Sequence, residues 1–100
     1  MKIMEHYFAV DLGATSGRTI VGCVIDGRLQ QRELTRFDNK LVETGGHVYW
    51  NLYSLYDEII KGLKLAHDEG LSISSIGIDT WGCDFALFSK DGALLGNPVA

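Results

Sequence analysis

The sequence has few of the residues that build metal centres and disulfide frameworks. It contains two cysteines in 100 residues, Cys23 and Cys83, and they do not form a closely spaced pair. Structural zinc sites and small secreted domains usually need several cysteines at characteristic spacings. We therefore expect both cysteines to be reduced thiols in a cytoplasmic protein.

Long apolar runs and clusters of basic charge are also missing. No segment approaches the ~20 consecutive apolar residues that a membrane-spanning helix needs. The first ten residues include Glu5 and His6, which is not typical of a signal peptide. The net charge is −4, and Lys and Arg form no run. These features argue against a membrane protein and against non-specific nucleic-acid binding.

The composition that remains is typical of a globular chain with a core. Apolar residues make up 46% of the sequence and charged residues 22%, and the length allows one small domain at most. The last residues, 94–100, are mostly apolar, whereas natural chain ends are usually exposed. We therefore expect the polypeptide to continue beyond residue 100.

The first part of the sequence predicts three strands in a meander. Tyr7–Val10 is a continuous apolar run, which predicts a strand buried on both faces. Thr19–Ile25 is rich in β-branched residues. Asp26 and Gly27 are typical of a type I′ hairpin turn, and the polar segment Arg28–Phe37 would return as an edge strand.

The second part predicts a loop, a helix and two further strands. Asp38–Tyr49 is expected to be a loop. Apolar residues at three- and four-residue spacing predict a helix over Leu52–Glu69, which Asn51 or Ser54 would cap at its start and Gly70 at its end. Further strands are expected at Ile73–Thr80 and at Phe85–Phe88. The order is therefore β-β-β-α-β-β, an α/β fold.

The predicted helix is long enough to connect two parallel strands. A crossover of this kind would set the strand that ends at Thr80 parallel to the first strand. If the two strands are neighbours, Asp11 and Asp79 lie at the same edge of the sheet. Open α/β sheets bind their ligands at that edge.

The segment Asp11–Arg18 has the composition of a phosphate-binding loop. Gly13 and Gly17 would let backbone N–H groups approach a phosphate, and Thr15 and Ser16 add hydroxyls. The segment lacks the Gly-Lys-Ser/Thr ending of a P-loop.

The two charged residues that bound this segment fit the same chemistry. Asp11 would repel a phosphate unless a cation lies between them, so it is a candidate ligand of Mg²⁺ or of its waters. Arg18 would add positive charge near the phosphates or pair with a carboxylate. The alternative is an ordinary turn with a surface arginine.

A second candidate site follows the strand that ends at Asp79. A carboxylate at the end of an apolar strand is unfavourable unless it is paired. Trp81 and Gly82 together offer an aromatic face beside accessible backbone, which suits a sugar. The alternative is that Trp81 packs in the core and that Asp79 caps a turn.

Two segments, Ala9–Arg18 and Ser75–Phe85, together closely resemble the FGGY carbohydrate kinases. The resemblance extends to Arg36–Asn39, to Tyr49 and Trp50, and to Gly96–Ala100, so it spans almost the whole chain. It implies that residues 1–100 are the N-terminal part of a ribonuclease-H-like first lobe, of the actin and hexokinase type. The rest of that lobe and a second lobe would follow.

The resemblance also implies roles for particular residues. Asp11 matches the catalytic aspartate that is associated with metal and phosphate, and Gly82 matches a position whose backbone contacts the sugar, beside Trp81 and Asp79. The ATP-contacting stretch is Ala14, Thr15, Ser16, Gly17 and Arg18. The catalytic base and the adenosine-binding elements would lie beyond residue 100, so residues 1–100 alone are expected to be inactive.

The activity that the resemblance implies is Mg²⁺-dependent transfer of the γ-phosphoryl group of ATP to a ketose. The first candidate is the C1 hydroxyl of L-rhamnulose, in rhamnose catabolism, and fuculose and xylulose are alternatives. A module of another class, a non-catalytic nucleotide-gated protein like actin or the chaperone ATPases, also stays open. Because one helix covers only one face of a sheet, we also expect the isolated chain to self-associate.

Overall fold

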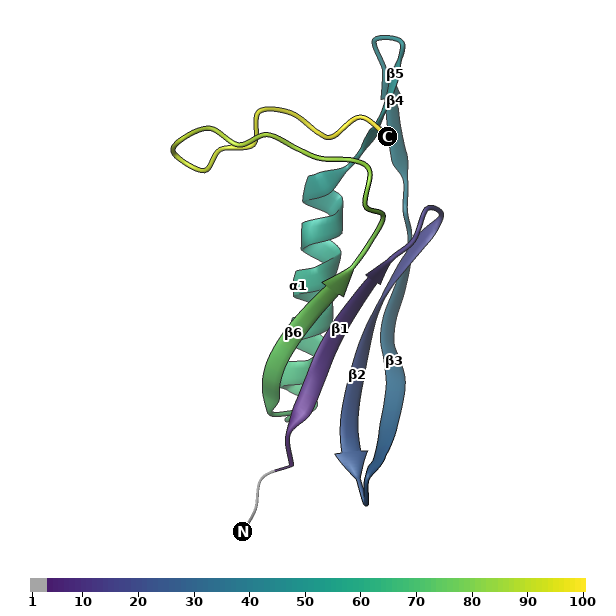
Figure 1. Ribbon diagram of the computed structural model, residues 1–100, viewed down its shortest axis with the longest axis vertical. Coiled ribbons are helices and arrows are strands. Elements are labelled where there is room, and N and C mark those ends of the chain that lie inside the picture. The colour runs from purple at the N-terminus through teal and green to yellow at the C-terminus, as the bar shows by residue number, and fades with distance from the viewer. Residues whose placement is uncertain (1–3) are drawn as a thin grey trace.

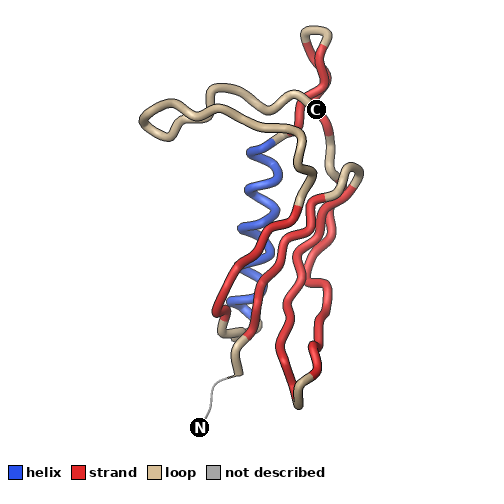
Figure 2. The backbone as a smooth tube through the Cα atoms, viewed as in Figure 1, coloured by secondary structure: helices blue, strands red, loops and turns tan. Residues whose placement is uncertain are grey.

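The computed structural model of the protein describes residues 4–100, which form a mixed sheet with one helix against it (Figure 1). The molecule is elongated, with extents of 56 × 30 × 24 Å. A short hairpin and the last twenty residues project from one end of the sheet (Figure 2). The elements are β1 (His6–Leu12), β2 (Ser16–Ile25), β3 (Arg28–Asp38), β4 (Leu41–Thr44), β5 (His47–Trp50), α1 (Leu52–Asp68) and β6 (Ile73–Asp79).

The predicted meander is confirmed. β1 pairs antiparallel with β2, and β2 with β3. The β2–β3 connection has positive φ at both central residues, 52° at Asp26 and 77° at Gly27, as a type I′ turn requires. The turn therefore fixes the register of the two longest strands.

The predicted parallel pair is also confirmed. The sheet order is β3-β2-β1-β6, and β6 runs parallel to β1 after the α1 crossover. Asp11 lies opposite Asp79 in this pairing. The two carboxylates therefore share the carboxyl edge of neighbouring strands.

The segment that was expected to be a loop, Asp38–Tyr49, contains a second hairpin. β4 and β5 pair antiparallel through a turn at Gly45 and Gly46, whose φ angles are 59° and 79°. Glycine adopts this left-handed conformation without strain, so the glycine pair closes a hairpin and does not mark an open loop.

The strand expected at Phe85–Phe88 is not formed. This segment makes one isolated antiparallel bridge, Phe88 to Leu94, around a turn in which Gly92 N–H donates to Ser89 O at 2.9 Å. Within residues 4–100 this segment pairs with no strand beyond that single bridge, so its backbone follows an irregular path. The α/β class is as predicted, but the observed order is β-β-β-β-β-α-β.

The helix α1 supplies the core from one side of the sheet. Asn51 is its N-cap, with Oδ1 accepting from Ser54 N–H at 3.2 Å, and Gly70 follows its end with a φ of 76°. Leu55 joins the buried side chains Phe8, Val10 and Leu12 of β1. No helix in residues 4–100 is long and apolar enough to cross a membrane.

Helix and sheet approach each other closely at Gly62. A Cβ atom at this position would lie 2.6 Å from Thr19 Oγ1, and Thr19 is fully buried. The absence of a side chain at Gly62 lets α1 lie directly on β2. This contact sets the spacing of the single helix–sheet layer.

The opposite face of the sheet is open, so the expectation that β1 is buried on both faces is wrong for this chain. Burial alternates along β1, with Phe8 and Val10 each 1% exposed and Tyr7 39% exposed. The strand pairing places Tyr7, Ile20, Val24 and Leu29 on the open face. The apolar run of β1 therefore has a helix on only one side.

This open face generates a prediction about assembly. We expect residues 1–100, as an isolated chain, to form dimers at micromolar concentration, because pairing of two open faces would remove apolar surface from water. Val24→Lys with Leu29→Lys is expected to weaken this dimer by about tenfold or more, since two charges would enter the interface. Sedimentation equilibrium measures the dimer affinity of the wild-type chain and of the double variant. A stable monomer that binds no hydrophobic dye would contradict the prediction.

Candidate functional site

The first part of the candidate site is the turn between β1 and β2. It consists of Gly13, Ala14 and Thr15, all exposed, and it is closed by a hydrogen bond from Gly13 N–H to Ser16 O at 2.9 Å. The sequence predicted a longer loop, but Ser16, Gly17 and Arg18 belong to β2. The exposed part of the predicted loop is therefore limited to three residues at the carboxyl end of β1.

Asn39 fixes this turn from the side. Its Nδ2 donates to Gly13 O at 2.8 Å, and its backbone N–H donates to Thr15 O at 2.9 Å. The residue is only 9% exposed. Sequence reasoning did not assign Asn39 to the site, because the contact depends on the β2–β3 pairing, which brings the end of β3 beside the start of β2.

Gly17 is explained by packing. A Cβ atom at Gly17 would lie 2.6 Å from Cε2 of Phe37 and 3.1 Å from Cδ2 of Leu12. Phe37 pairs with Gly17 across β2 and β3, and its ring occupies the space that a side chain would need. The glycine therefore lets an aromatic ring close the core directly beneath the turn.

Charged groups lie at the edge of the sheet beside the turn. Arg18 Nε donates to Asp11 Oδ2 at 3.1 Å across the β1–β2 pair, and the two side chains are 42% and 45% exposed. Asp79 is exposed next to Asp11, and among residues 4–100 no side chain forms the pair that was expected for its carboxylate. Because β6 is an edge strand and Asp79 is exposed, its carboxylate needs no buried partner.

This edge offers oxygen ligands but not a complete metal site. Two carboxylates converge on one edge, and hard cations such as Mg²⁺ prefer oxygen ligands. No group of three His, Cys, Asp or Glu side chains that could hold a metal occurs in the described chain, residues 4–100. Mg²⁺ usually keeps several waters and binds through one or two carboxylates together with phosphate oxygens, so this donor set suits it.

The second part of the candidate site is the turn Trp81–Asp84, which follows β6. The indole rings of Trp81 and Trp50 are stacked, with centroids 3.8 Å apart and planes at 19°. Trp50 Nε1 donates to Asp84 Oδ2 at 2.5 Å. Trp81 also packs against the core cluster, so its ring has a structural contact on one face. Gly82 is exposed, and a Cβ atom there would meet nothing within 4 Å.

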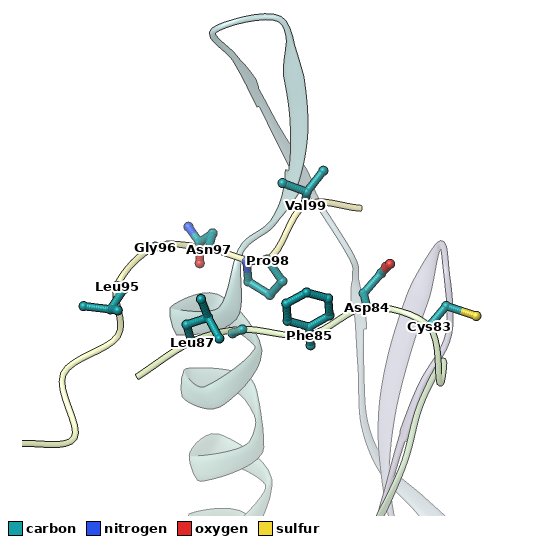
Figure 3. A pocket seen from close by; sticks show the side chains of 10 residues that line it. Cys83, Asp84, Phe85, Leu87, Leu95, Gly96, Asn97, Pro98 and Val99 are labelled. Atoms are coloured by element: carbon teal, nitrogen blue, oxygen red, sulfur yellow. The ribbon is translucent and has the colours of Figure 1, made fainter. Parts of the chain in front are cut away.

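A cavity of about 290 Å³ lies directly beyond this turn (Figure 3). Two segments line it, Cys83–Leu87 and Leu95–Val99, and the side chains of Phe85, Leu87 and Pro98 form much of its wall. No sequence pattern predicted this cavity, because its walls are irregular segments that meet only in three dimensions.

The structure therefore gathers the predicted site residues into two groups. Asp11, Arg18 and Asp79 lie together at the edge of the sheet with the Gly13–Thr15 turn. Trp81 and Gly82 form a second group together with Asp84, which was not predicted as a site residue, and Trp81 connects this group to the core cluster. The core cluster beneath both groups includes Leu12, the residue that precedes the turn.

Comparison with known proteins gives one consistent result. The chain is 60% identical over 96 residues to the rhamnulokinase of Bacteroides thetaiotaomicron, which is 96% of this chain and 20% of that protein. It is 43% identical over 97 residues to the rhamnulokinase of Ligilactobacillus salivarius and 46% identical over 99 residues to that of an Enterobacter species, each over 97% of this chain and 20% of the relative. No family model matches.

The chain thus spans about a fifth of the length of the curated relatives that it matches. The crystal structure of gluconate kinase from Lactobacillus acidophilus superimposes on 96% of this chain, and on 19% of its own length, with a TM-score of 0.75 at 15% identity. The resemblance to carbohydrate kinases is therefore confirmed, and the fold of the chain matches the part of the gluconate kinase on which it superimposes.

The contacts of Asn39 generate a prediction about stability. Asn39→Ala is expected to lower the free energy of unfolding by about 1 kcal/mol, because one hydrogen bond to the turn is lost. Asn39→Asp is expected to lower it further, because a carboxylate would face Gly13 O without a hydrogen to donate. Urea unfolding measures both, and the exposed neighbour Lys40→Ala, expected to change stability by less than about 0.5 kcal/mol, is the control. Wild-type stability of Asn39→Asp would show that the bond contributes nothing.

Proposed function

We propose that the full-length protein containing this chain is a cytoplasmic, ATP- and Mg²⁺-dependent kinase that phosphorylates the C1 hydroxyl of L-rhamnulose in rhamnose catabolism. The observation that carries the proposal is the 60% identity to a rhamnulokinase over 96% of the chain, which includes both groups of site residues. Because the chain spans a fifth of such proteins, the activity belongs to the full-length polypeptide and not to residues 1–100 alone.

In this proposal the β1–β2 turn binds the phosphates of ATP. Gly13 N–H is used inside the turn, so the donors toward a phosphate are the backbone N–H groups of Ala14 and Thr15 and the hydroxyls of Thr15 and Ser16. Asn39 holds the turn in place, which lowers the entropy lost when a phosphate binds. Gly17 supports the turn through packing beneath it, and Arg18 supplies positive charge at its end.

Asp11 is proposed as the residue that holds Mg²⁺, directly or through its waters, with Asp79 beside it. A bound cation would neutralise charge on the phosphates during transfer. The Asp11–Arg18 pair is nearly half exposed, and pairs of this kind contribute little to stability, so the carboxylate is available to a ligand. Arg18 orients the carboxylate across the β1–β2 pair.

The sugar is proposed to bind at the Trp81–Asp84 turn. Gly82 leaves its backbone accessible, and Trp81 provides an aromatic wall that is held in place by Trp50. The general base that removes the proton from the sugar hydroxyl, and the adenosine site, are proposed to lie beyond residue 100. The role of this chain is then to position two substrates and to bring charge to the transferred group.

The test is ketose-dependent ADP production by the full-length protein. We expect L-rhamnulose to be phosphorylated with a higher kcat/KM than fuculose or xylulose. Gly82→Val is expected to raise KM for the sugar by about tenfold or more and to leave KM for ATP nearly unchanged, because the new side chain fills space beside the exposed backbone. A preference for another ketose would correct the substrate. ATP turnover without any sugar dependence would favour the nucleotide-gated class.

Asp11 gives a second prediction for the full-length protein. We expect Asp11→Ala to lower kcat by about 10²-fold or more, which corresponds to roughly 2.7 kcal/mol of transition-state stabilisation. Asp11→Asn, which keeps the shape but removes the charge, is expected to lose nearly as much. Initial rates over a range of Mg²⁺ concentrations measure the effect. Near-normal kcat of Asp11→Asn at saturating Mg²⁺ would show that the charge has no catalytic role.

A further inference from the structure

One side chain, Trp50, holds both ends of the Trp81–Asp84 turn. Its ring face stacks on Trp81 at a centroid distance of 3.8 Å, and its ring N–H donates to Asp84 Oδ2. Stacked aromatic rings attract one another beyond the apolar area that they bury, and a hydrogen bond to a charged acceptor is stronger than one between neutral groups. The turn is therefore held by two different interactions that begin at the same residue.

Apart from the packing of Trp81 against the core cluster, little else holds this turn. Within residues 4–100, no backbone–backbone hydrogen bond involves Trp81, Gly82, Cys83 or Asp84, and the pairing of β6 with β1 ends at Asp79. Gly82 and Cys83 are exposed. A segment without backbone hydrogen bonds moves easily unless side chains restrain it.

Trp50 itself is firmly placed. The residue is 8% exposed, and its backbone N–H donates to Pro98 O at 2.9 Å. The next residue, Asn51, caps α1, and Leu52 N–H donates to Asn97 Oδ1 at 2.9 Å. The β4–β5 hairpin, the start of α1 and the 97–98 segment therefore meet at Trp50 and fix its backbone.

We propose that Trp50 is a positioning residue for the sugar site: it fixes the Trp81–Asp84 turn, and with it the exposed Gly82 backbone, without touching the sugar. This inference rests on the proposed function of that turn. It gives the β4–β5 hairpin, which carries no residue of the proposed ligand sites, a role in sugar binding. The β1–β2 turn depends on Asn39 instead. Removal of the Trp50 contacts is therefore expected to weaken binding of the sugar and not of ATP.

The kinetic test uses variants of the full-length protein that remove the hydrogen bond and keep an aromatic ring for stacking. Trp50→Phe keeps an aromatic ring for stacking and removes the N–H donor, and Asp84→Ala removes the acceptor while the buried ring stays. We expect each to raise KM for the ketose by about tenfold, with KM for ATP changed by less than about twofold. The double variant is expected to be no worse than either single variant, because both changes break the same bond.

Two further variants serve as controls. Asp84→Asn keeps an acceptor oxygen for the indole N–H and is expected to lie closer to wild type than Asp84→Ala. Tyr49→Phe changes the neighbouring aromatic residue of β5 and is expected to leave both KM values unchanged. The proposal would be overturned if Trp50→Phe and Asp84→Ala changed KM for the ketose and KM for ATP equally, or changed neither.

Hydrogen exchange of the same variants, followed by mass spectrometry, tests the positioning without activity. We expect faster exchange in Asp84→Ala and Trp50→Phe at peptides covering residues 81–84, and unchanged exchange in β1 and β2. If the wild-type protein phosphorylates no ketose but this local effect is seen, the proposed function fails and the positioning stands. If exchange at residues 81–84 is unchanged, or rises equally along the chain, Trp50 does not position the turn.

Discussion

The parallel pairing of β1 with β6 is the constraint on which the rest of the structure depends. β1 and β6 are parallel, so a short turn cannot connect them. The pair forms only if α1 returns the chain across the sheet. Gly62 permits that return, because it lets α1 lie directly on Thr19. Once the pair is formed, its register sets Asp11 opposite Asp79, and the segments that leave the two strands begin at the same edge.

The two segments that leave this edge are stabilised in different ways. The β1–β2 turn is held by backbone hydrogen bonds and by Asn39, which the β2–β3 pairing brings beside it. Among residues 4–100, the Trp81–Asp84 turn has no such backbone support and is held by the stacked ring and the N–H group of Trp50 and by the packing of Trp81 on the core. One half of the candidate site thus depends on the sheet, and the other half depends on the hairpin and the start of the helix.

The sequence predicts best what local chemistry decides. Asp26 and Gly27 give the β2–β3 turn, the apolar spacing gives α1, and the helix between two apolar runs gives the parallel pair and the shared edge. The β4–β5 hairpin is not predicted, because a glycine pair such as Gly45 and Gly46 is also typical of a flexible loop, whereas here their positive φ angles close a tight turn. Phe85–Phe88 has the apolar character that is typical of a strand. This character does not show whether a partner strand exists, so the prediction was wrong.

The contacts of the candidate site were hardest to predict, because they join residues far apart in the sequence. Asn39 lies 26 residues from Gly13, and Trp50 lies 34 residues from Asp84. Neither residue type predicts such a distant contact, since asparagine is common after strands and tryptophan is common in cores. A position that holds a site in place without binding the ligand leaves no motif in the sequence. Its role follows from what it contacts, and the contact exists only after the sheet, the helix and the hairpin have assembled.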